Sequence, residues 1–540
     1  MLFFIPAWYA QNEWRENEQV WYSKRMQTEM DDTVKQIQLF HRTMQYPYQI
    51  LLLSYAPNFR HFLHRQGVFN APYWSCFDAI SCIKTKQTAV LSFYDFEWPE
   101  HIEFIYSYFA VIAKLHGKKY GQVEFGEDGN PIRVDFFRND QLVRRDHYDD
   151  RGFIGSTVVY ENGQMLHESY LDPHGTWKIR HFADGHVEVN PESAYYYLEH
   201  ESVKIGVPYM RTVYESLDAV ISEVTENYIS LIAKKHIFCV AMHDRHTAVL
   251  APLLADRRTI LSFWTGRSYN SDRAAAFRMM EQANCLIADS QATRHQLTVD
   301  MGSMQKRILE ITPYDSRMDF GISLQQHTQK VLIPVDHVPD ALFADIITQT
   351  ARYMEKNPHA CVHLFTRNAL YDRQDLILAK TQAVLEAIGS EPAWARKPSP
   401  RKPAPTLEEE EETIPIRYYV EQCVEELSVS KCVRVQRLLV DLAPEPDLFL
   451  QIVCLSMGIP QILRKETRYM TAGKNGRINT RVENLGDDMA FYLESIANWN
   501  QAMISSYELG AAYTSKELAQ RWKEVISEIG KDSNSTAGKD

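Results

Sequence analysis

Side chains able to do acid–base chemistry, or to bind a polar ligand, follow the ends of apolar runs in this chain. His243 and Asp244 come directly after the run at 236–242, and Arg267 follows the run at 258–264. A neighbouring histidine and carboxylate can form an acid/base pair, and a guanidinium can bind a carboxylate or a sugar. The ends of parallel strands meet at one mouth of a sheet, where α/β proteins bind ligands. The candidate ligand contacts at this mouth are His243, Asp244, Trp264, Arg267 and Ser290.

Ordinary structural roles remain open for the same residue types. His243 and Asp244 could cap the strand end, and Arg267 could lie in a solvated loop. Further along, Glu445 precedes an apolar segment in helical register that runs to Gly458. An acid at that position can bind a ligand or simply complement the helix dipole.

The sequence lacks the signature motifs of several enzyme classes. The sequence contains no G-x-S-x-G elbow, no G-x-G-x-x-G fingerprint and no P-loop, which argues against α/β-hydrolases, NAD enzymes and P-loop NTPases. The eight cysteines form no C-x-x-C pair and have no His-rich partner. We therefore expect reduced thiols, no metal site and no cofactor.

Length and charge narrow the class of protein. A chain of 540 residues is too long for one core, so two or three domains are expected. The net charge of -12 argues against nucleic acid as a partner. The apolar opening lacks the features of a signal peptide, and no uncharged run approaches the roughly 18 apolar residues of a membrane span. The sequence predicts a cytoplasmic protein with no transmembrane segment.

Three successive patterns of predicted secondary structure along the chain indicate an α/β fold with an insertion. Strands such as 2–5, 50–54 and 89–94 alternate with helices over 1–118, which predicts the opening half of a first Rossmann-like domain. Turn signals then recur between alternating segments over 119–200, which predicts an inserted antiparallel β-meander domain with one free face. After the insertion we expect the closing half of the first Rossmann-like domain at 201–328, a second Rossmann-like domain at 329–514, and a C-terminal helix and tail at 515–540.

One segment of the second domain has a composition that is unsuited to packing in a hydrophobic core. Residues 390–415 are rich in proline and then carry five consecutive glutamates. Such a composition cannot bury enough apolar surface to order itself. We predict a disordered surface loop, and we expect deletion of residues 393–412 to leave the melting temperature nearly unchanged.

Ordered motifs resemble the retaining GT-B glycosyltransferases. The stretch at 440–463 has their order of strand, loop, helix, Gly-x-Pro and strand, which in those enzymes holds the sugar nucleotide. AMHDRHTAVLAPLL at 241–254, TILSFWTGRS at 259–268 and LIADSQATRHQL at 286–297 resemble pieces of their first half. The resemblance implies a GT-B-like pair of Rossmann-type parallel-sheet domains. The meander resembles the add-on domain of transferases that glycosylate serine-rich repeat adhesins.

The chain ends and the middle resemble one family more specifically. LFFIPAWYAQNEW at 2–14, Trp21-Tyr22, MDDTVKQIQLF at 30–40 and TPYDSRMDFGIS at 312–323 are similar to segments of the glycosyltransferase-like accessory Sec secretion proteins. These are the first of three cytosolic accessory secretory proteins. The resemblance implies a non-enzymatic factor for the export of glycosylated serine-rich repeat adhesins. Its implied partners are two companion accessory secretory proteins, a SecA-type motor ATPase and the serine-rich repeat glycoprotein cargo, with peripheral association at the inner face of the cell membrane left open.

The resemblance also implies a vestigial donor site. Counted back from Gly458, the acidic pair of the transferases falls on Glu445 and Val453, so an aliphatic residue replaces the ribose-binding acid. Residues 331–351, where those enzymes supply cations for the diphosphate, contain neither Arg nor Lys. That window instead contains Asp336, Asp340 and Asp345. We therefore expect a pseudo-glycosyltransferase in which Glu445, Val453 and Gly458 mark the old site.

A chain without catalysis must act through its surfaces. The candidate partner surface consists of aromatic residues after the first strand and in the meander, namely Trp8, Tyr9, Trp14, Tyr160, Tyr170 and Trp177. Aromatics at a strand exit also suit sugar stacking or core anchoring. Two other functions remain open: an active GT-B glycosyltransferase with a divergent donor site, and a scaffold that binds the glycans of the adhesin.

Overall fold

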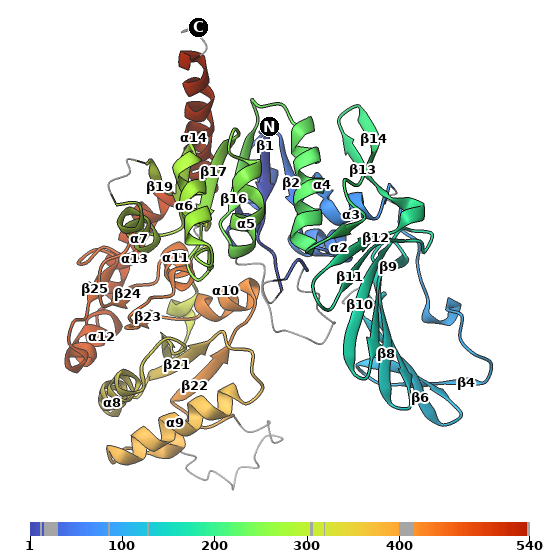
Figure 1. Ribbon diagram of the computed structural model, residues 1–540. Helices are drawn as coiled ribbons and strands as arrows, with labels where there is room; N and C mark the ends of the chain where they lie inside the picture. Colours follow the sequence, from blue (N-terminus) through green and yellow to red (C-terminus); the bar gives the residue numbers. More distant parts are fainter. Residues whose placement is uncertain are drawn as a thin grey trace. The chain divides into compact units, whose positions relative to one another are not determined.

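The chain folds into two compact units. The computed structural model describes residues 1–10, 13–15, 31–84, 87–126, 129–302, 306–317, 319–398 and 415–536 (Figure 1). The first unit comprises Met1–Pro313 and Trp522–Asp540, and the second comprises Tyr314–Arg521. Within the described residues, no helix is both long enough and apolar enough to cross a membrane.

The first unit is built on a seven-stranded sheet in the order β19-β18-β17-β16-β1-β2-β3, with every pair parallel. Its central strands read as continuous apolar runs because both faces of the sheet are covered. The strands predicted near residues 2–5 and 50–54 are confirmed. The bounds are β1 Leu2–Ile5, β2 Tyr48–Leu52, β3 Tyr73–Ser75, β16 Ile237–Ala241, β17 Arg258–Phe263, β18 Cys285–Ala288 and β19 Ile308–Glu310.

Helices cover both faces of this sheet. They are α1 Asp32–Arg42, α2 Phe59–Arg65, α3 Cys76–Ile80, α4 Leu217–Leu231, α5 Asp244–Leu253, α6 Arg273–Gln282, α7 Gln291–Met301 and α14 Ser515–Thr536. The start of α1 is set by Asp31, whose carboxylate accepts the backbone N–H groups of Thr33 and Val34. Ser216 caps α4 and Ser290 caps α7 in the same way.

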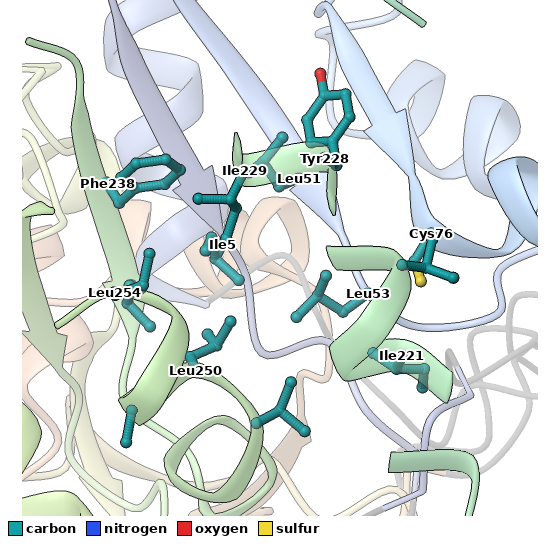
Figure 2. Packing of buried hydrophobic residues seen from close by; sticks show 14 of the residues in the cluster. Ile5, Leu51, Leu53, Cys76, Ile221, Tyr228, Ile229, Phe238, Leu250 and Leu254 are labelled. Carbon is teal, nitrogen blue, oxygen red and sulfur yellow. The ribbon is translucent and has the colours of Figure 1, made fainter. Parts of the chain in front are cut away.

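Alternate residues of β1 face different cores. Phe3 and Ile5 belong to a cluster shared with α4 and α5, some of which is drawn in Figure 2. Phe4 points to the other face, where its ring lies 5.1 Å from that of Phe40 on α1. Trp522 of α14 is buried against the same Phe40 at 5.5 Å, so the C-terminal helix completes the core of the first unit.

The predicted meander is an antiparallel sheet in the order β15-β12-β11-β10-β9-β8-β7-β6-β5-β4. Its turns fall at the predicted signals: Asn139 and Asp140 both have positive φ, as a two-residue hairpin of the primed type requires. The separate hairpin β13–β14 lies between β12 and β15 along the chain. The bounds are β4 Ile102–Tyr106, β5 Ala110–Leu115, β6 Lys118–Phe125, β7 Pro131–Arg138, β8 Gln141–Asp149, β9 Phe153–Glu161, β10 Gln164–Leu171, β11 Trp177–Phe182, β12 Val187–Val189, β13 Tyr195–His200, β14 Val203–Pro208 and β15 Val213–Tyr214.

Two expectations for this region are wrong. The sheet begins at Ile102, well before the expected boundary at residue 119. Residues 89–94 are not a strand: the segment ends in the 3₁₀ helix η2 Phe93–Asp95 and exposes Val90. Apolar residues 91, 93, 96 and 98 pack instead on a small cluster of Val111, Val123, Val134 and Tyr148, which come from strands β5 to β8 of the sheet.

The second unit is a six-stranded, all-parallel sheet in the order β22-β21-β20-β23-β24-β25. Its strands are β20 Gln329–Pro334, β21 Ala360–Thr366, β22 Tyr418–Gln422, β23 Leu438–Asp441, β24 Gln461–Leu463 and β25 Gly476–Ile478. Its helices are α8 Asp340–Lys356, α9 Arg373–Ala387, α10 Glu426–Arg434, α11 Leu448–Met457, α12 Leu485–Leu493 and α13 Ile496–Gly510. As predicted, α11 ends at Gly458, whose φ of 70° is the left-handed conformation that favours glycine at a helix end.

The expectation that residues 390–415 form an unpacked loop is wrong for the beginning of that segment. Pro392–Trp394 form the 3₁₀ helix η5, and Trp394 lies against the guanidinium of Arg417. Ala395 is fully buried and bridges to Tyr418 of β22, because it belongs to the apolar cluster of the second unit. The glutamate run lies in residues 399–414, outside the described residues. Deletion of residues 393–412 would therefore also remove the packed Trp394 and Ala395.

Candidate functional site

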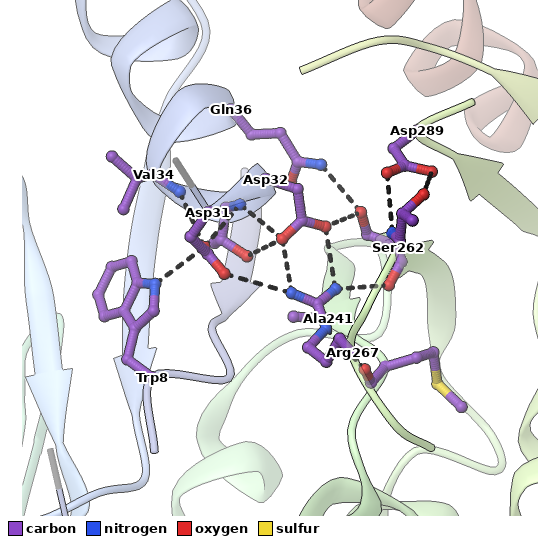
Figure 3. A network of polar contacts seen from close by, with 12 residues as sticks. Trp8, Asp31, Asp32, Val34, Gln36, Ala241, Ser262, Arg267 and Asp289 are labelled. Atoms are coloured by element: carbon purple, nitrogen blue, oxygen red, sulfur yellow. Dashed lines mark hydrogen bonds and ion pairs between the residues drawn. The ribbon is translucent and has the colours of Figure 1, made fainter. Parts of the chain in front are cut away.

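The mouth of the first sheet is organised around a buried arginine. Arg267 forms a bidentate pair with Asp32, at 2.6 Å and 3.0 Å, and a longer contact of 3.3 Å with Asp31 (Figure 3). Its remaining donors reach the carbonyl oxygens of Met242 at 2.8 Å and Ser262 at 3.0 Å. The expectation of a ligand-binding or solvated Arg267 is wrong, because its donors are used within the protein and its side chain is buried.

The two aspartates beside Arg267 differ in their electrostatics. Burial, together with the neighbouring carboxylate of Asp32, raises the pKa of Asp31 to about 6. Burial also opposes the charge of Asp32, but the charge and hydrogen bonds of Arg267 outweigh it and lower the pKa of that carboxyl. Asp32 further accepts the hydroxyl of Ser262 at 2.6 Å. The network therefore pairs the guanidinium of Arg267 with the ionised carboxylate of Asp32, as a structural clamp between α1 and the loop after β17.

His243 and Asp244 lie at the start of α5, and each accepts a hydrogen bond from a backbone N–H group. The Nδ1 of His243 accepts the backbone N–H of Arg245 at 3.1 Å, and Asp244 accepts the N–H of Ser271 at 2.8 Å. Burial, reinforced by the charge of Arg267, lowers the pKa of His243 to about 4. At neutral pH this histidine is uncharged and its Nδ1 caps α5, whereas Asp244 holds the loop before α6.

The other predicted contacts at this mouth also belong to local structure. Ser290 is the buried N-cap of α7, and its hydroxyl accepts the N–H of Thr293 at 3.2 Å. Trp264 is half-buried beside the guanidinium of Arg267, with 6.0 Å between the ring centroid and the guanidinium carbon. Burial raises the pKa of the adjacent Asp289, which accepts the N–H of Thr265 at 2.8 Å. The predicted contacts at this mouth are thus mostly engaged in capping and pairing within the unit.

The aromatic residues after β1 are anchors of the core and not a docking surface. Trp8 is buried against Phe62 and donates its indole N–H to Asp31 at 2.9 Å. Trp14 is buried, and its indole N–H donates to Asp218. Tyr9 is half-buried and its hydroxyl lies 2.6 Å from the Nε2 of the buried His246.

The aromatic residues predicted on the meander are only partly exposed for contact with a partner protein. Tyr170 is buried between Tyr55 and Phe77, with ring centroids 5.1 Å and 4.9 Å away, so its assignment to a partner surface is wrong. Tyr160 and Trp177 are half-buried and each lies beside an arginine of the same sheet.

A different set of aromatic residues is exposed at one edge of this sheet. Tyr106, Tyr108 and Phe109 lie in and beside the β4–β5 hairpin, and Tyr94 joins them through a hydroxyl contact with Tyr106. Their side chains are 55–89% exposed. We call Tyr94, Tyr106, Tyr108 and Phe109 the hairpin aromatic surface. It flanks β4, which is an edge strand of the ten-stranded sheet.

A cavity of about 370 Å³ lies between the antiparallel sheet and the starts of α4 and α5. Its lining combines an aromatic ring with charged groups: Trp14, Glu168, His181, Asp218 and Arg245. Arg245 donates to Asp218 at 3.3 Å, and Glu168 pairs with Arg15. Burial lowers the pKa of His181 and favours its neutral form. This combination of an aromatic ring and hydrogen-bonding groups suits a small polar ligand.

In the second unit, the N-terminus of α11 is occupied by the chain itself. Asp447 is the N-cap, and its Oδ1 accepts the N–H of Leu450 at 3.0 Å. The same carboxylate forms a bidentate pair with Arg367, at 2.9 Å and 3.2 Å. A helix N-terminus of this kind is where an anion would bind, and here the anion is Asp447.

Two further carboxylates lie at the ends of the neighbouring strands. Asp336, after β20, accepts the N–H of Arg367 at 2.7 Å and a guanidinium N–H of Arg373 at 3.1 Å. Asp441, at the end of β23, accepts the N–H of Asp447 at 2.8 Å. Burial raises the pKa of Asp441 to about 7, although the hydrogen bond from Asp447 opposes the shift. The other two acids of the 331–351 window, at positions 340 and 345, are exposed on α8.

The three residues predicted to mark the old donor site differ in exposure and in structural role. Glu445 is exposed in the loop before α11, whereas Val453 is buried within that helix. Gly458 ends the helix, and a Cβ there would lie 2.7 Å from Met503. Glycine is therefore required for backbone and packing reasons at this position.

Sequence reasoning missed Arg367 and Asp447, which form the central pair of this site. Arg367 directly follows β21, outside the 331–351 window, and 80 positions separate it from Asp447. Two local signals could have found them: a polar Thr-Arg-Asn step that begins with the last residue of the run 360–366, and an aspartate directly before an apolar helical segment.

Sequence comparisons cover almost the whole chain. The family model described as accessory Sec system protein, first of the Asp series, matches residues 1–529. The accessory Sec system protein of that description from Streptococcus gordonii is 30% identical over 535 residues, which cover 98% of this chain and 99% of that protein.

Solved structures agree with the fold described above. One is the complex of accessory secretory proteins 1, 2 and 3 in Streptococcus pneumoniae, with a TM-score of 0.77 and 25% identity over 98% of this chain and 99% of that chain. Another is the pneumococcal O-GlcNAc transferase GtfA in complex with UDP and GlcNAc, with a TM-score of 0.67 and 10% identity over 98% of each chain. The second likeness concerns the fold alone and confirms the predicted GT-B-like architecture.

Proposed function

Because the chain belongs to the family of accessory Sec system proteins, first of the Asp series, we propose that it serves accessory Sec export as a member of a protein complex and does not transfer sugars. It is an accessory factor of that pathway with a GT-B-like fold. Its companions are two further accessory secretory proteins, by analogy with the complex of proteins 1, 2 and 3.

The observation that carries the non-enzymatic side of the proposal is the bidentate pair between Arg367 and Asp447. A GT-B donor site needs free backbone N–H groups and cations to hold a diphosphate. Asp447 takes up the helix N-terminus, and its carboxylate neutralises the arginine beside that terminus. A diphosphate would have to displace Asp447 and then lie near the buried Asp441 and the Arg373-bound Asp336.

Glu445 offers a direct test of an idle donor site. Its side chain is exposed, so Glu445→Ala should leave the fold unchanged. We expect this variant to support adhesin export at the wild-type level. A strong loss of export with normal folding and normal complex assembly would contradict the proposal, since only a working site would need this acid.

The hairpin aromatic surface is the proposed docking site for a companion protein. Protein interfaces are centred on a few aromatic and arginine anchors, and an exposed edge strand can accept further main-chain pairing. Tyr106, Tyr108 and Phe109 provide such anchors beside the edge strand β4. This surface replaces the buried Trp8, Trp14 and Tyr170 in the proposal.

Co-purification tests the docking site. A variant with Tyr106, Tyr108 and Phe109 changed to serine should fold normally, because all three side chains are exposed. We expect it to lose a companion protein, since each anchor contributes about 2 kcal/mol or more. Tyr371→Ser is the matched control, because Tyr371 is fully exposed on the second unit. Retention of both companions by the triple variant would contradict the assignment.

A second candidate function is binding of the glycans of the adhesin cargo. The cavity beside Trp14 and Arg245 favours it, because aromatic rings and charged hydrogen-bonding groups are the usual contacts of a sugar. Titration with a GlcNAc-modified serine-rich peptide should then show binding that Arg245→Met weakens. Absence of binding to the wild-type chain would remove this candidate and leave the export role untouched.

The remaining partners follow from the proposed role. Cargo export requires contact with the SecA-type motor ATPase and with the serine-rich repeat glycoprotein. We expect these contacts in the cytoplasm and at the inner face of the cell membrane, where the cargo enters its channel.

A further inference from the structure

We infer that Glu421, Cys423 and Cys432 form a binding site for a thiophilic divalent cation, with Zn²⁺ as the best fit. One ligand atom from each residue lies within 4.8 Å of the other two. Two thiolates and a carboxylate are ligands that Zn²⁺ accepts, whereas Mg²⁺ and Ca²⁺ prefer oxygen ligands alone. The site does not depend on the proposed function.

The fold brings the three ligands together at the end of the edge strand β22. Glu421 lies in β22, Cys423 follows its last residue, and Cys432 lies on α10. Glu421 and Cys423 point to the same face of the sheet, since alternate strand residues share a face. The cysteines are separated by eight residues, so their pairing depends on α10 packing onto β22. Sequence reasoning expected no metal because it sought closely spaced cysteines.

Neighbouring polar side chains contact two of the three ligands. His363 on β21 lies 2.8 Å from Glu421 through its Nδ1, and the histidine is buried. A histidine–carboxylate contact of this kind orients a metal-binding carboxylate. The Nε2 of Gln436 lies 3.9 Å from the sulfur of Cys432 and can donate to a thiolate there.

Access and charge also fit a bound cation. Cys423 and Cys432 are buried, whereas the side chain of Glu421 is 35% exposed, so a cation can enter from the carboxylate side. Each thiol releases one proton to solvent as its sulfur binds the metal, so uptake of one Zn²⁺ releases two protons. A tetrahedral Zn²⁺ site needs a fourth ligand, and water on the partly exposed side of Glu421 would supply it.

Metal titration of the reduced, metal-free full chain tests the site. We expect one equivalent of Zn²⁺ to bind in competition with a chromophoric chelator. Co²⁺ in its place should give sulfur-to-metal charge-transfer absorption. The variant with both Cys423 and Cys432 changed to serine should lose this equivalent, and Glu421→Gln should weaken binding at least tenfold. Cys82→Ser is the matched control, because Cys82 is a free thiol outside the cluster and should leave binding unchanged.

The test remains decisive even if the double-serine variant folds poorly, because a second variant and a direct measure of folding accompany it. Glu421→Gln preserves shape at a partly exposed position, and circular dichroism of each metal-free variant reports its fold. The melting temperature of the wild-type chain should rise with Zn²⁺, because the cation binds only the folded site. The inference is overturned if the wild-type chain takes up no more Zn²⁺ than the double-serine variant, or if Glu421→Gln binds as tightly as the wild type.

Discussion

At the scale of single residues, the polar groups at both sheet mouths are matched to partners within the same unit. Arg267 makes five hydrogen bonds to its own unit, and Asp447 both caps a helix and pairs with Arg367. A binding site keeps some donors and charges free for its ligand. These two residues therefore act in folding, and the pairs they form have measurable consequences for stability.

Replacement of Arg267 by methionine should strongly destabilise the first unit. The change leaves the carboxylate of Asp32 buried without its counter-ion, which costs about 3–5 kcal/mol. Urea unfolding followed by circular dichroism measures the loss. Arg211→Met is the control, since Arg211 and its partner Glu215 are exposed and such pairs contribute about 1 kcal/mol or less. Equal losses in the two variants would show that the Arg267 network is not a clamp.

Asp441 should make stability depend on pH. Burial raises its folded pKa from 3.8 to about 7, so the folded state favours the protonated acid. Ionisation therefore costs stability as pH rises from about 4 to 7, and protonation relieves that cost as pH falls. The stability of Asp441→Asn relative to wild type should rise over this range by an amount on the order of 4 kcal/mol, at about 1.4 kcal/mol for each pKa unit. A constant difference between the two proteins from pH 4 to 8 would refute this.

At the scale of elements, helices α11 and α14 each have a defined structural role. The N-terminus of α11 is capped by Asp447, so its dipole is already matched by a negative charge. The C-terminal helix α14 begins among the last residues of the second unit and supplies Trp522 to the core of the first. Residues near the end of the chain thus help to form the fold of its beginning.

The contribution of α14 can be measured through Trp522. This side chain is almost fully buried against Phe40, so Trp522→Ala should cost about 3–5 kcal/mol of unfolding free energy. Lys523→Ala, on the exposed side of the same helix, should change stability by less than about 0.5 kcal/mol. If Trp522→Ala unfolded at the urea concentration of the wild type, α14 would not belong to the core.

At the scale of the whole molecule, periodicity predicts more of the fold than of the site. The apolar runs and turn signals place both parallel sheets and the antiparallel sheet, because these patterns are local. The site depends on contacts between distant positions: 235 positions separate Arg267 from Asp32, and the pairing of Cys423 with Cys432 needs α10 to pack on β22. Aromatic residues such as Trp8 also look alike in sequence whether they anchor a core or dock a partner, and only burial separates the two roles.

The central claim is that a GT-B-like chain has lost its donor site and acts through its partners. Isothermal titration calorimetry of the full chain with UDP-GlcNAc and with UDP-glucose tests it most directly. Because Asp447 occupies the α11 N-terminus and Val453 is buried and aliphatic, we expect no binding with a Kd below about 0.1 mM, which corresponds to about -5.5 kcal/mol. A Kd below about 0.1 mM for either sugar nucleotide would contradict the account.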